Sequence, residues 1–246
     1  MRDRLAEIGS RLEAWGSFRV LRRLDGGYRN LVFLVADLAG ALFVAKTTER
    51  GGASLAWAAR LQAEARRAGI VVPQYRRAPN GCLGAGGLTI EPFIEGRQAT
   101  QADLVRLRPA LARLRAATAG WAQRPGFASA ADLLTRQRGG DIDLSRMPAD
   151  LAAACRAAWE PLVGRRETAI HGDLNSSNLL IEKAGRLVLL DWDEARRDSP
   201  LFDHCFAGTT PPPRLVRAWV AWEVASGWNK EPAYAQALAA RLLGVG

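Results

Sequence analysis

A polar loop followed by two short apolar segments, near residue 180, constrains the fold more than any other stretch. The loop covers residues 171–177, and the apolar segments are 178–181 and 187–190. The residues that connect the two segments include Gly185, which is typical of a tight turn. We therefore expect a short β-hairpin, with the polar loop leading into its first strand.

Three hard oxygen donors lie at or near the ends of these strands. Asp173 is in the polar loop, Asn178 follows five residues later, and Asp191 comes thirteen residues after that, at the end of the second strand. Carboxylate and amide oxygens suit Mg²⁺, and a carboxylate can also hold a hydroxyl proton. Taken singly, such residues are common in turns and caps. Their combined spacing, next to strands, favours a catalytic and metal-binding role.

The length and the cysteines limit the class of protein. A chain of 246 residues is enough for one large domain or for two closely joined lobes. No apolar run approaches the length that spans a membrane, and the charged N-terminus differs from a signal peptide. Cys82, Cys155 and Cys205 are scattered, odd in number and without metal-ligand spacing. They indicate a reducing compartment, so we expect a cytoplasmic protein with no membrane partner.

A net charge of +9 could indicate a nucleic acid, an anionic membrane or a phosphorylated ligand as the partner. The arginines are dispersed along the chain, and no basic stripe is interleaved with aromatic residues. This pattern disfavours nucleic-acid binding. A basic nucleic-acid-binding module is therefore kept only as an alternative, which would show a steep dependence of affinity on salt.

The N-terminal part predicts an amphipathic helix followed by an antiparallel meander. The expected helix is 2–15, and the expected strands are 18–24, 31–35 and 42–46. The turn after the first strand contains Gly26 and Gly27, which would let backbone N–H groups approach phosphate oxygens closely. Because Asp-Gly-Gly is also a common hairpin turn, this signal alone is weak.

Lys46 ends an apolar strand in a chain that has only two other lysines and otherwise uses arginine. A compact ammonium at such a place suggests phosphate binding, whereas a surface lysine is the ordinary interpretation. Glu64 lies in the next expected helix, 54–68, which Ser54 would cap. An ion pair with Glu64 would orient Lys46, although Arg60 offers Glu64 a partner within its own helix.

Two further strands and five helices complete the expected secondary structure. The strands 71–75 and 88–94 precede a boundary between lobes, which we place after residue 94 because Pro92 and Gly96 suit an extended connector. The expected helices beyond the boundary are 103–118, 130–138, 149–163, 214–225 and 231–243.

Together these motifs resemble the aminoglycoside phosphotransferase and choline kinase superfamily, which has the protein-kinase-like fold. The resemblance extends from about residue 18 to about residue 206 and depends most on the catalytic-loop motif around Asp173. It implies an α+β, bilobal protein-kinase-like fold. An antiparallel β N-terminal lobe over residues 1–94 would bind the nucleotide. A mainly helical C-terminal lobe over residues 95–246 would carry the catalytic and acceptor-binding residues.

The resemblance also implies a role for each matching residue, with ATP and Mg²⁺ as cofactors. Asp173 would be the catalytic base, and Asn178 and Asp191 would bind Mg²⁺. Lys46 would hold the nucleotide phosphates, with Glu64 as its partner. The remaining cofactor-binding positions belong to the turn over the phosphates and to the strand whose backbone would contact adenine: Gly26, Gly27, Asn30, Glu91, Phe93 and Ile94.

Departures from protein kinases bear on the acceptor. Gly172 stands where protein kinases have Arg, and Trp192-Asp193 stand where they have Phe-Gly. Helices resume soon after Asp191, which leaves no room for a long activation segment or a peptide-docking platform. A small-molecule acceptor is therefore expected: an aminoglycoside, an amino alcohol such as choline, or a sugar. The sequence does not choose among these, and it does not predict the oligomeric state.

Side chains after Asp191 could recognise a cationic acceptor. Three carboxylates are available, and tryptophans could supply cation–π contacts, although solvated acids and core tryptophans are the ordinary interpretations. The candidates are Asp193, Glu194, Asp198, Trp192, Trp219 and Trp222. Asp203 leads a further expected helix and could cap it or brace the catalytic loop; we favour a structural role.

The main alternative is a nucleotide-binding pseudokinase that acts through a protein partner. All the expected ligand positions are intact in the sequence, which favours the enzyme. Turnover of ATP with any acceptor would distinguish the two.

Overall fold

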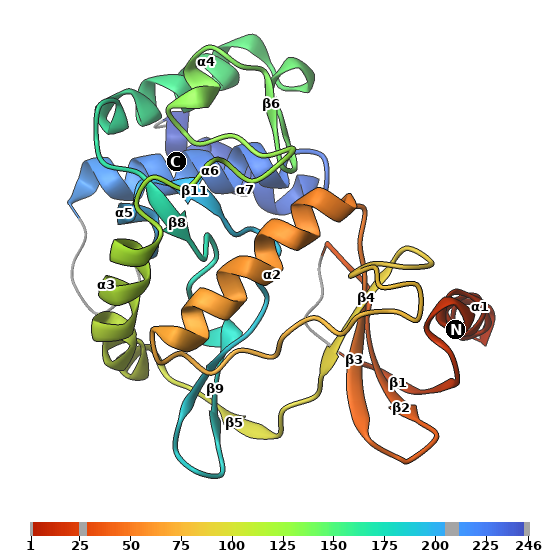
Figure 1. Ribbon diagram of the computed structural model, residues 1–246. Helices are drawn as coiled ribbons and strands as arrows, with labels where there is room; N and C mark the ends of the chain where they lie inside the picture. The colour runs from red at the N-terminus through yellow and green to blue at the C-terminus, as the bar shows by residue number, and fades with distance from the viewer. Residues whose placement is uncertain (1, 25–28, 205–211, 244–246) are drawn as a thin grey trace.

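The computed structural model describes residues 2–24, 29–204 and 212–243 of the chain. A four-stranded antiparallel sheet lies beside a mainly helical part, and the long helix α2 (Gly52–Arg67) crosses the centre of the view between them (Figure 1). The α+β class expected from the sequence is confirmed.

The four-stranded sheet is a meander in which each strand pairs with the next along the chain. Its strands are β1 (Phe18–Leu24), β2 (Val32–Asp37), β3 (Leu42–Thr47) and β4 (Leu88–Pro92). A short turn after β2 permits this order, because the Asp37 carboxylate accepts hydrogen bonds from the amides of Ala39 and Ala41 (3.0 and 2.9 Å). The strand register places Lys46, near the end of β3, opposite Thr89.

Helix α1 (Arg2–Leu12) and the 3₁₀ turn η1 (Glu13–Trp15) pack against this sheet. The side chains of Ile8 and Trp15 are buried in one cluster with apolar residues of β2, β3 and β4. The Trp15 indole also donates a hydrogen bond to the Ala85 carbonyl (2.9 Å), which satisfies its buried N–H.

Helix α2 begins after Gly51, so the N-cap expected at Ser54 is wrong. The Ser54 hydroxyl is buried and accepts a hydrogen bond from Arg124 Nε (2.8 Å), which commits it to a tertiary contact rather than to the helix end. The helix ends at Arg67. Gly69 follows with φ of +93°, the left-handed conformation that glycine adopts most easily after a helix.

The predicted hairpin is confirmed as β9 (Leu179–Glu182) and β10 (Leu187–Leu189), with Gly185 at φ +77° in the turn. The short strand β5 (Gly96–Gln98) pairs with the other edge of β9. A Cβ on Gly96 would lie 2.8 Å from a carbonyl oxygen of β9, so this close approach requires glycine.

The expected strand 71–75 is wrong. Val71 forms only an isolated parallel bridge with Val188 of β10. Pro73 has no N–H to donate, which explains why pairing does not continue. This segment therefore connects the N-terminal part to the hairpin instead of extending the N-terminal sheet.

The C-terminal part is mainly helical. Its α-helices are α3 (Arg108–Ala117), α4 (Ala149–Trp159), α5 (Leu201–His204), α6 (Pro213–Gly227) and α7 (Pro232–Leu243). The apolar faces of α4, α6 and α7 enclose Trp159 and Trp222, whose ring centroids lie 6.1 Å apart. The helices expected at the C-terminal end are confirmed, and so is the core role of Trp222.

Short elements connect these helices. The 3₁₀ turns are η2 (Gln101–Leu107), η3 (Asp132–Leu134), η4 (Leu144–Arg146), η5 (Glu160–Leu162) and η6 (Ser176–Asn178). The paired short strands are β6 (Arg138–Gly139) with β7 (Ile142–Asp143) and β8 (Thr168–Ile170) with β11 (Arg196–Asp198).

The expected helix 130–138 is wrong, since the structure has only the turn η3 there. The Asp132 carboxylate accepts a hydrogen bond from the Ser129 amide (3.0 Å), a local bond that competes with helix formation. Gly139 and Gly140 then form the tight β6–β7 hairpin, with Gly140 at φ +61°. This hairpin places Asp141 at its tip.

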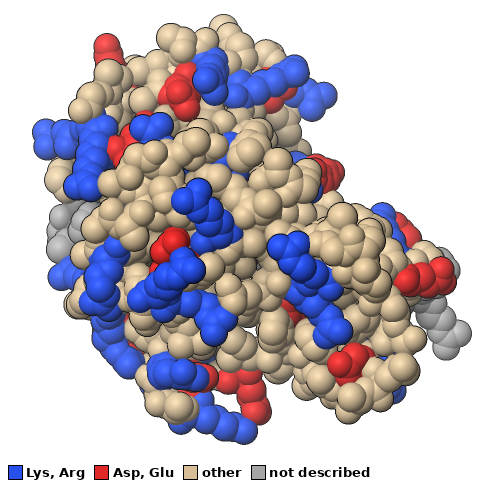
Figure 2. Space-filling model, in the orientation of Figure 1, with Lys and Arg blue, Asp and Glu red and all other residues tan. Residues whose placement is uncertain are grey.

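Lys and Arg side chains lie in separate groups over the visible face of the molecule, several of them beside acidic side chains (Figure 2). This matches the dispersed arginines of the sequence. Within the described residues, no helix combines the length and the apolar character that crossing a membrane demands.

We expect the β6–β7 hairpin to depend on Gly139. A Cβ there would lie 2.3 Å from Ala128 Cβ and 2.6 Å from Ala128 N, so Gly139→Ala should lower the free energy of unfolding by about 1–3 kcal/mol. Gly9→Ala is the matched control, because a Cβ on Gly9, within α1, meets nothing within 4 Å; it should be neutral or stabilising. Urea unfolding measures both, and equal effects would contradict the packing argument.

Candidate active site

The Asp173 carboxylate is held in place by two amide side chains. Asn175 Nδ2 donates to Asp173 Oδ1 (2.8 Å), and Asn178 Nδ2 donates to Asp173 Oδ2 (2.7 Å). Asn175 Oδ1 accepts hydrogen bonds from the amides of Ser177 and Asn178 (2.8 and 3.2 Å), and so caps the turn η6. The loop thus fixes the carboxylate relative to the first strand of the hairpin. Burial raises the pKa of the Asp173 carboxyl, and the nearby charge of Asp191 adds to the effect.

His171 is a buried positioning residue. Its Nδ1 accepts a hydrogen bond from the Asp173 amide (3.3 Å), so its Nε2 carries the hydrogen that is donated to the Leu190 carbonyl (2.7 Å). The ring also meets Trp192 edge to face, with centroids 4.8 Å apart. His171 therefore ties the polar loop to the end of the hairpin.

Asp203 braces the catalytic loop from α5. Its carboxylate, on a side chain only 2 % exposed, accepts hydrogen bonds from the amides of His171 (2.9 Å) and Gly172 (3.0 Å). Gly172 has φ +86°, and a Cβ there would lie 2.4 Å from the Glu194 carbonyl oxygen. The loop can therefore lie against the following segment only with glycine at this position.

Asp191 combines a strained backbone with a charged contact. It is the only non-glycine residue of positive φ (55°) within the described ranges, a conformation that costs free energy and often marks functional positions. Its Oδ1 forms an ion pair with Lys46 Nζ and accepts a hydrogen bond from the Asp193 amide (3.3 Å). The structure therefore brings Lys46, from the N-terminal sheet, to the predicted metal ligand.

The ion pair expected between Lys46 and Glu64 does not form between these described residues. Glu64 pairs with Arg67 (2.5 Å), one helical turn away in α2, and Lys46 pairs with Asp191. Arg67 follows Glu64 by three residues on the same helix, a spacing at which side chains meet without any tertiary contact. Glu91 is the glutamate near Lys46: burial raises the pKa of its carboxyl to about 8, even though the ammonium of Lys46 opposes this shift.

Arg124 fixes the segment that follows Asp191 and was not anticipated from the sequence. The side chain is 1 % exposed, and its Nη1 donates to the carbonyls of Asp193 (2.7 Å) and Ala195 (2.9 Å). A basic residue in an irregular loop gives no periodic signal. Its role depends on burial, which only the fold shows.

A cavity of about 260 Å³ contains the strand residues expected to contact adenine. Glu91, Phe93 and Ile94 line it together with apolar side chains of the sheet and the hairpin. The Phe93 amide donates to the Leu42 carbonyl (3.1 Å), so this donor is already used within the sheet.

A second cavity, of about 640 Å³, contains the catalytic-loop residues. Its lining includes Asn30, Lys46, Asp173, Asn178 and Asp191. Asn30 Nδ2 donates to Asp193 Oδ2 (3.3 Å). The other two residues expected in the phosphate-covering turn, Gly26 and Gly27, lie outside the described residues.

Carboxylates on the C-terminal side of this larger cavity form a set that the sequence revealed only in part. Glu194 was among the expected acids, whereas Glu223 and Glu231 were missed. Glu223 is the only acidic residue in α6, an otherwise largely buried helix, and that was a usable signal. Burial raises the pKa of Glu223 to about 7, although the charge of Arg29 opposes the shift.

Several side chains proposed as cation-binding groups serve the interior instead. Asp198 pairs with Arg196 (2.9 Å), and both are buried. The Arg196 guanidinium lies 3.3 Å from the centroid of the Trp222 ring, so a cation–π contact within the protein already uses this ring. Trp192 is buried and donates to the Leu189 carbonyl (3.0 Å).

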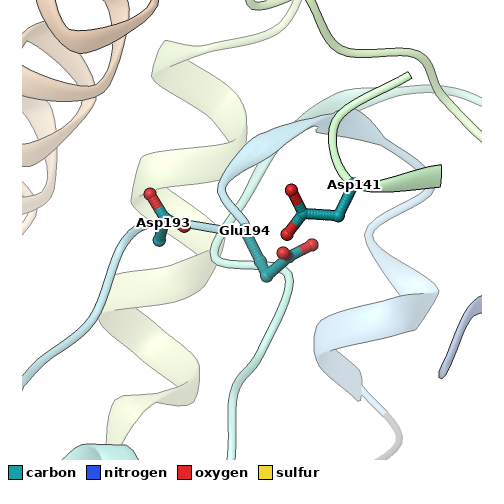
Figure 3. A group of neighbouring side chains, drawn as sticks. All are labelled: Asp141, Asp193 and Glu194. Carbon is teal, nitrogen blue, oxygen red and sulfur yellow. The ribbon is translucent and has the colours of Figure 1, made fainter. Parts of the chain in front are cut away.

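Asp141, Asp193 and Glu194 bring carboxylate oxygens within 4.8 Å of one another (Figure 3). Asp193 and Glu194 follow Asp191, and Asp141 comes from the hairpin that faces them. Arginines from the N-terminal part already neutralise this cluster. Arg50 donates to Asp141 (2.9 and 3.1 Å) and to Asp193 (3.1 Å), and Arg29 pairs with Glu194 (2.8 Å). The cluster is thus a set of ion pairs between the two parts of the molecule.

We expect Asp203 to stabilise the catalytic loop. Asp203→Ala would leave the buried amide of His171 and the half-buried amide of Gly172 without acceptors, at a cost of about 1–3 kcal/mol for each group. Asp203→Asn keeps one acceptor oxygen and should lose roughly half as much. Urea unfolding of the two variants and the parent measures this order. Equal stability of all three would show that the brace contributes nothing.

Comparisons with known proteins identify the family and the fold. A search of curated proteins found no match. Among solved structures, choline kinase from Streptococcus pneumoniae superposes with a TM-score of 0.64 at 13% identity, covering 99% of this chain and 98% of that one. Macrolide 2′-phosphotransferase from Brachybacterium faecium gives 0.57 at 19% identity, with 98% of each chain covered. An amicoumacin kinase complex gives 0.57 at 13% identity, with 99% of this chain and 79% of that one covered.

At these identities the superpositions show the fold, which is that of the kinase-like phosphotransferases. Membership in a family is shown by the sequence match. The model of the phosphotransferase enzyme family matches residues 20–240, nearly the whole chain. The resemblance to aminoglycoside phosphotransferases and choline kinases is confirmed, and the chain belongs to the phosphotransferase enzyme family.

Proposed function

We propose that this chain is an ATP- and Mg²⁺-dependent kinase that transfers the γ-phosphoryl group to a hydroxyl of a small cationic acceptor. The observation that carries the proposal is the junction of the two cavities. Lys46, Asn178 and Asp191 line both the cavity of about 260 Å³ and the cavity of about 640 Å³. A nucleotide in the first would present its phosphates at that junction, and the second would hold the acceptor.

The residues at the junction fit a magnesium ion. Asn178 Oδ1 forms no hydrogen bond with a described residue, and the Asp191 carboxylate lines the same cavities, so two hard oxygen donors are available. A bound Mg²⁺ would neutralise charge on the phosphates. Lys46 would keep a positive charge beside them: burial opposes this, but the carboxylates of Asp191 and Asp193 raise the pKa of Lys46 well above its usual range. The structural neighbour amicoumacin kinase was solved with AMP-PNP and Ca²⁺, which supports a nucleotide and a divalent cation here.

Asp173 would orient the acceptor hydroxyl and take up its proton. The amides of Asn175 and Asn178 fix both carboxylate oxygens, so the group is positioned before any acceptor arrives. Phosphoryl transfer depends on positioning and charge stabilisation more than on covalent help, which suits a site with one fixed carboxylate and one ammonium.

The acids that line the larger cavity favour a cationic acceptor. Glu194, Glu223 and Glu231 surround the space beyond Asp173, and an amine would neutralise them. The neighbours named as a choline kinase and a gentamicin complex of an aminoglycoside phosphotransferase support an amine-bearing acceptor. A neutral sugar would bring no charge to this wall, where Arg29 already pairs with Glu194 (2.8 Å) and Glu231 (2.6 Å).

The division into lobes belongs to the same proposal. Residues 1–94 would form the nucleotide-binding lobe and supply Lys46 and Glu91. Residues 95–246 would form the catalytic and acceptor-binding lobe and supply Asp173 and Asp191.

We expect Asp173→Asn to lower turnover by about 10²–10⁴-fold while nucleotide binding stays, because the variant loses the proton acceptor and one of the two oxygens that accept from Asn175 and Asn178. Asp191→Ala should abolish the Mg²⁺-dependent part of the stabilisation by ATP, which a thermal-shift titration measures. Turnover is followed as ADP release with choline, an aminoglycoside and a neutral sugar as acceptors. Asp150→Asn, an exposed carboxylate on α4, is the control and should behave as the parent.

Full activity of Asp173→Asn would remove Asp173 from the mechanism. Mg²⁺-dependent ATP binding without transfer to any acceptor would instead support the alternative of a nucleotide-binding protein that acts through a partner.

We expect the KM for a cationic acceptor to rise as the pH falls through about 7. The raised pKa of Glu223 leaves its carboxyl charged above about pH 7 and neutral below it, so attraction for the acceptor is present at high pH and lost at low pH. Glu223→Gln should remove this component of the pH profile between pH 6 and pH 8. Glu160→Gln, an exposed position, should leave it unchanged. A profile that Glu223→Gln does not alter would exclude Glu223 from acceptor binding.

A further inference from the structure

Arg29 reaches from the N-terminal part into the acceptor cavity. Its Nε donates to Glu231 (2.6 Å), its Nη1 to Glu194 (2.8 Å) and its Nη2 to Ser226 (3.1 Å). The three partners come from three segments of the C-terminal part, and Arg29 lines the same cavity as Asp173. Two of its nitrogens therefore bind carboxylates that line this cavity, and the third binds a hydroxyl of α6.

Arg29 balances a strongly acidic wall. The charged residues that line this cavity are six carboxylates and two cations: Asp173, Asp191, Asp193, Glu194, Glu223, Glu231, Lys46 and Arg29. Lys46 is paired with Asp191, so Arg29 is the cation of this lining that faces the glutamates. Burial raises the pKa of Glu194, and the charge of Arg29 opposes that rise.

The contact between the two parts of the molecule does not depend on Arg29 alone. Arg50 forms its own hydrogen bonds with Asp141 and Asp193, and its Nη2 lies 3.9 Å from Glu194. If the Arg29 guanidinium left the cavity, these bonds would still join the two parts. The Arg29 side chain is 18 % exposed, so it lies at an accessible edge of the wall rather than in the core.

We infer that Arg29 is an internal occupant of the acceptor site, which a cationic acceptor must displace from Glu194 and Glu231 before it can bind. This inference rests on the proposed function, because it presupposes an acceptor in this cavity. An ammonium group can replace the ion pairs of Arg29, whereas a neutral acceptor would leave two carboxylates without a cation. Arg29 thereby makes the site selective for cationic acceptors.

Displacement has a cost that lowers apparent affinity. When an internal group fills a site most of the time, the apparent dissociation constant rises by the inverse of the fraction that is free. Removing the Arg29 charge should therefore tighten binding of a cation. A residue that only supported the fold would have no such effect, because its loss would weaken binding or leave it unchanged.

Isothermal titration of the full chain, without nucleotide, tests this directly. The probe is 2-deoxystreptamine, a cyclitol with two amines, and myo-inositol is the neutral counterpart. Arg29→Met should bind 2-deoxystreptamine at least about tenfold more tightly than the parent and should show no gain for myo-inositol. Arg29→Lys, which keeps the charge, should stay within about threefold of the parent.

Lys230→Met is the matched control, because it removes a cation that joins the same two parts through Glu49 (2.9 Å), and neither Lys230 nor Glu49 lines the acceptor cavity. It should bring no gain in affinity for the diamine. Arg29→Gln is the second variant if Arg29→Met does not fold, with folding checked by circular dichroism. Equal or weaker binding by the Arg29 variants, or no detectable binding by any of the proteins, overturns the inference.

The same measurement separates this inference from the proposed function. Phosphorylation of a cationic acceptor together with unchanged affinity in Arg29→Met would support the proposed kinase and exclude Arg29 as an occupant of the site. Tighter binding in Arg29→Met without phosphoryl transfer to any acceptor would support Arg29 as the occupant and exclude the proposed kinase.

Discussion

A set of buried and half-buried ion pairs joins the N-terminal part to the catalytic segment. Lys46 pairs with Asp191, Arg50 with Asp141 and Asp193, and Arg29 with Glu194 and Glu231. Every cation comes from the beginning of the chain, and every carboxylate from its second half. Such pairs add little net stability, because desolvation offsets the attraction, but breaking one partner leaves a buried charge and is costly. They therefore fix how the two parts meet, and with it the shape of both cavities.

Behind these charges, backbone contacts hold the catalytic loop. Asp203 binds the amides at the start of the loop, His171 joins the loop to the hairpin, and Arg124 binds the carbonyls after Asp191. These residues do not line the cavity of about 640 Å³. Their contribution is to keep the oxygens of Asp173 and Asp191 in one arrangement, so that little reorganisation is needed when a substrate binds. The strain at Asp191, with φ of 55°, persists because this framework surrounds it.

Sequence reasoning succeeded where the signal was local. The hairpin followed from two apolar runs and a glycine, and the helices α6 and α7 match the expected ranges 214–225 and 231–243 within a few residues. It failed where local and distant contacts compete. Ser54 does not cap α2 but accepts a hydrogen bond from Arg124, and Glu64 pairs with Arg67 instead of Lys46. Residues 130–138 form a turn and one strand of a hairpin instead of a helix. In each case spacing along the chain could not show which competing contact would form.

By itself the sequence determined the catalytic-loop motif, the α+β class and the phosphotransferase family, because Asp173, Asn178 and Asp191 lie close together along the chain and next to a recognisable hairpin. The tertiary structure alone decided which side chains surround them. Glu223, Glu231 and Arg29 converge from segments far apart in sequence. Their meeting depends on how helices pack and on where a buried charge finds a counter-charge, and neither leaves a periodic pattern in the sequence.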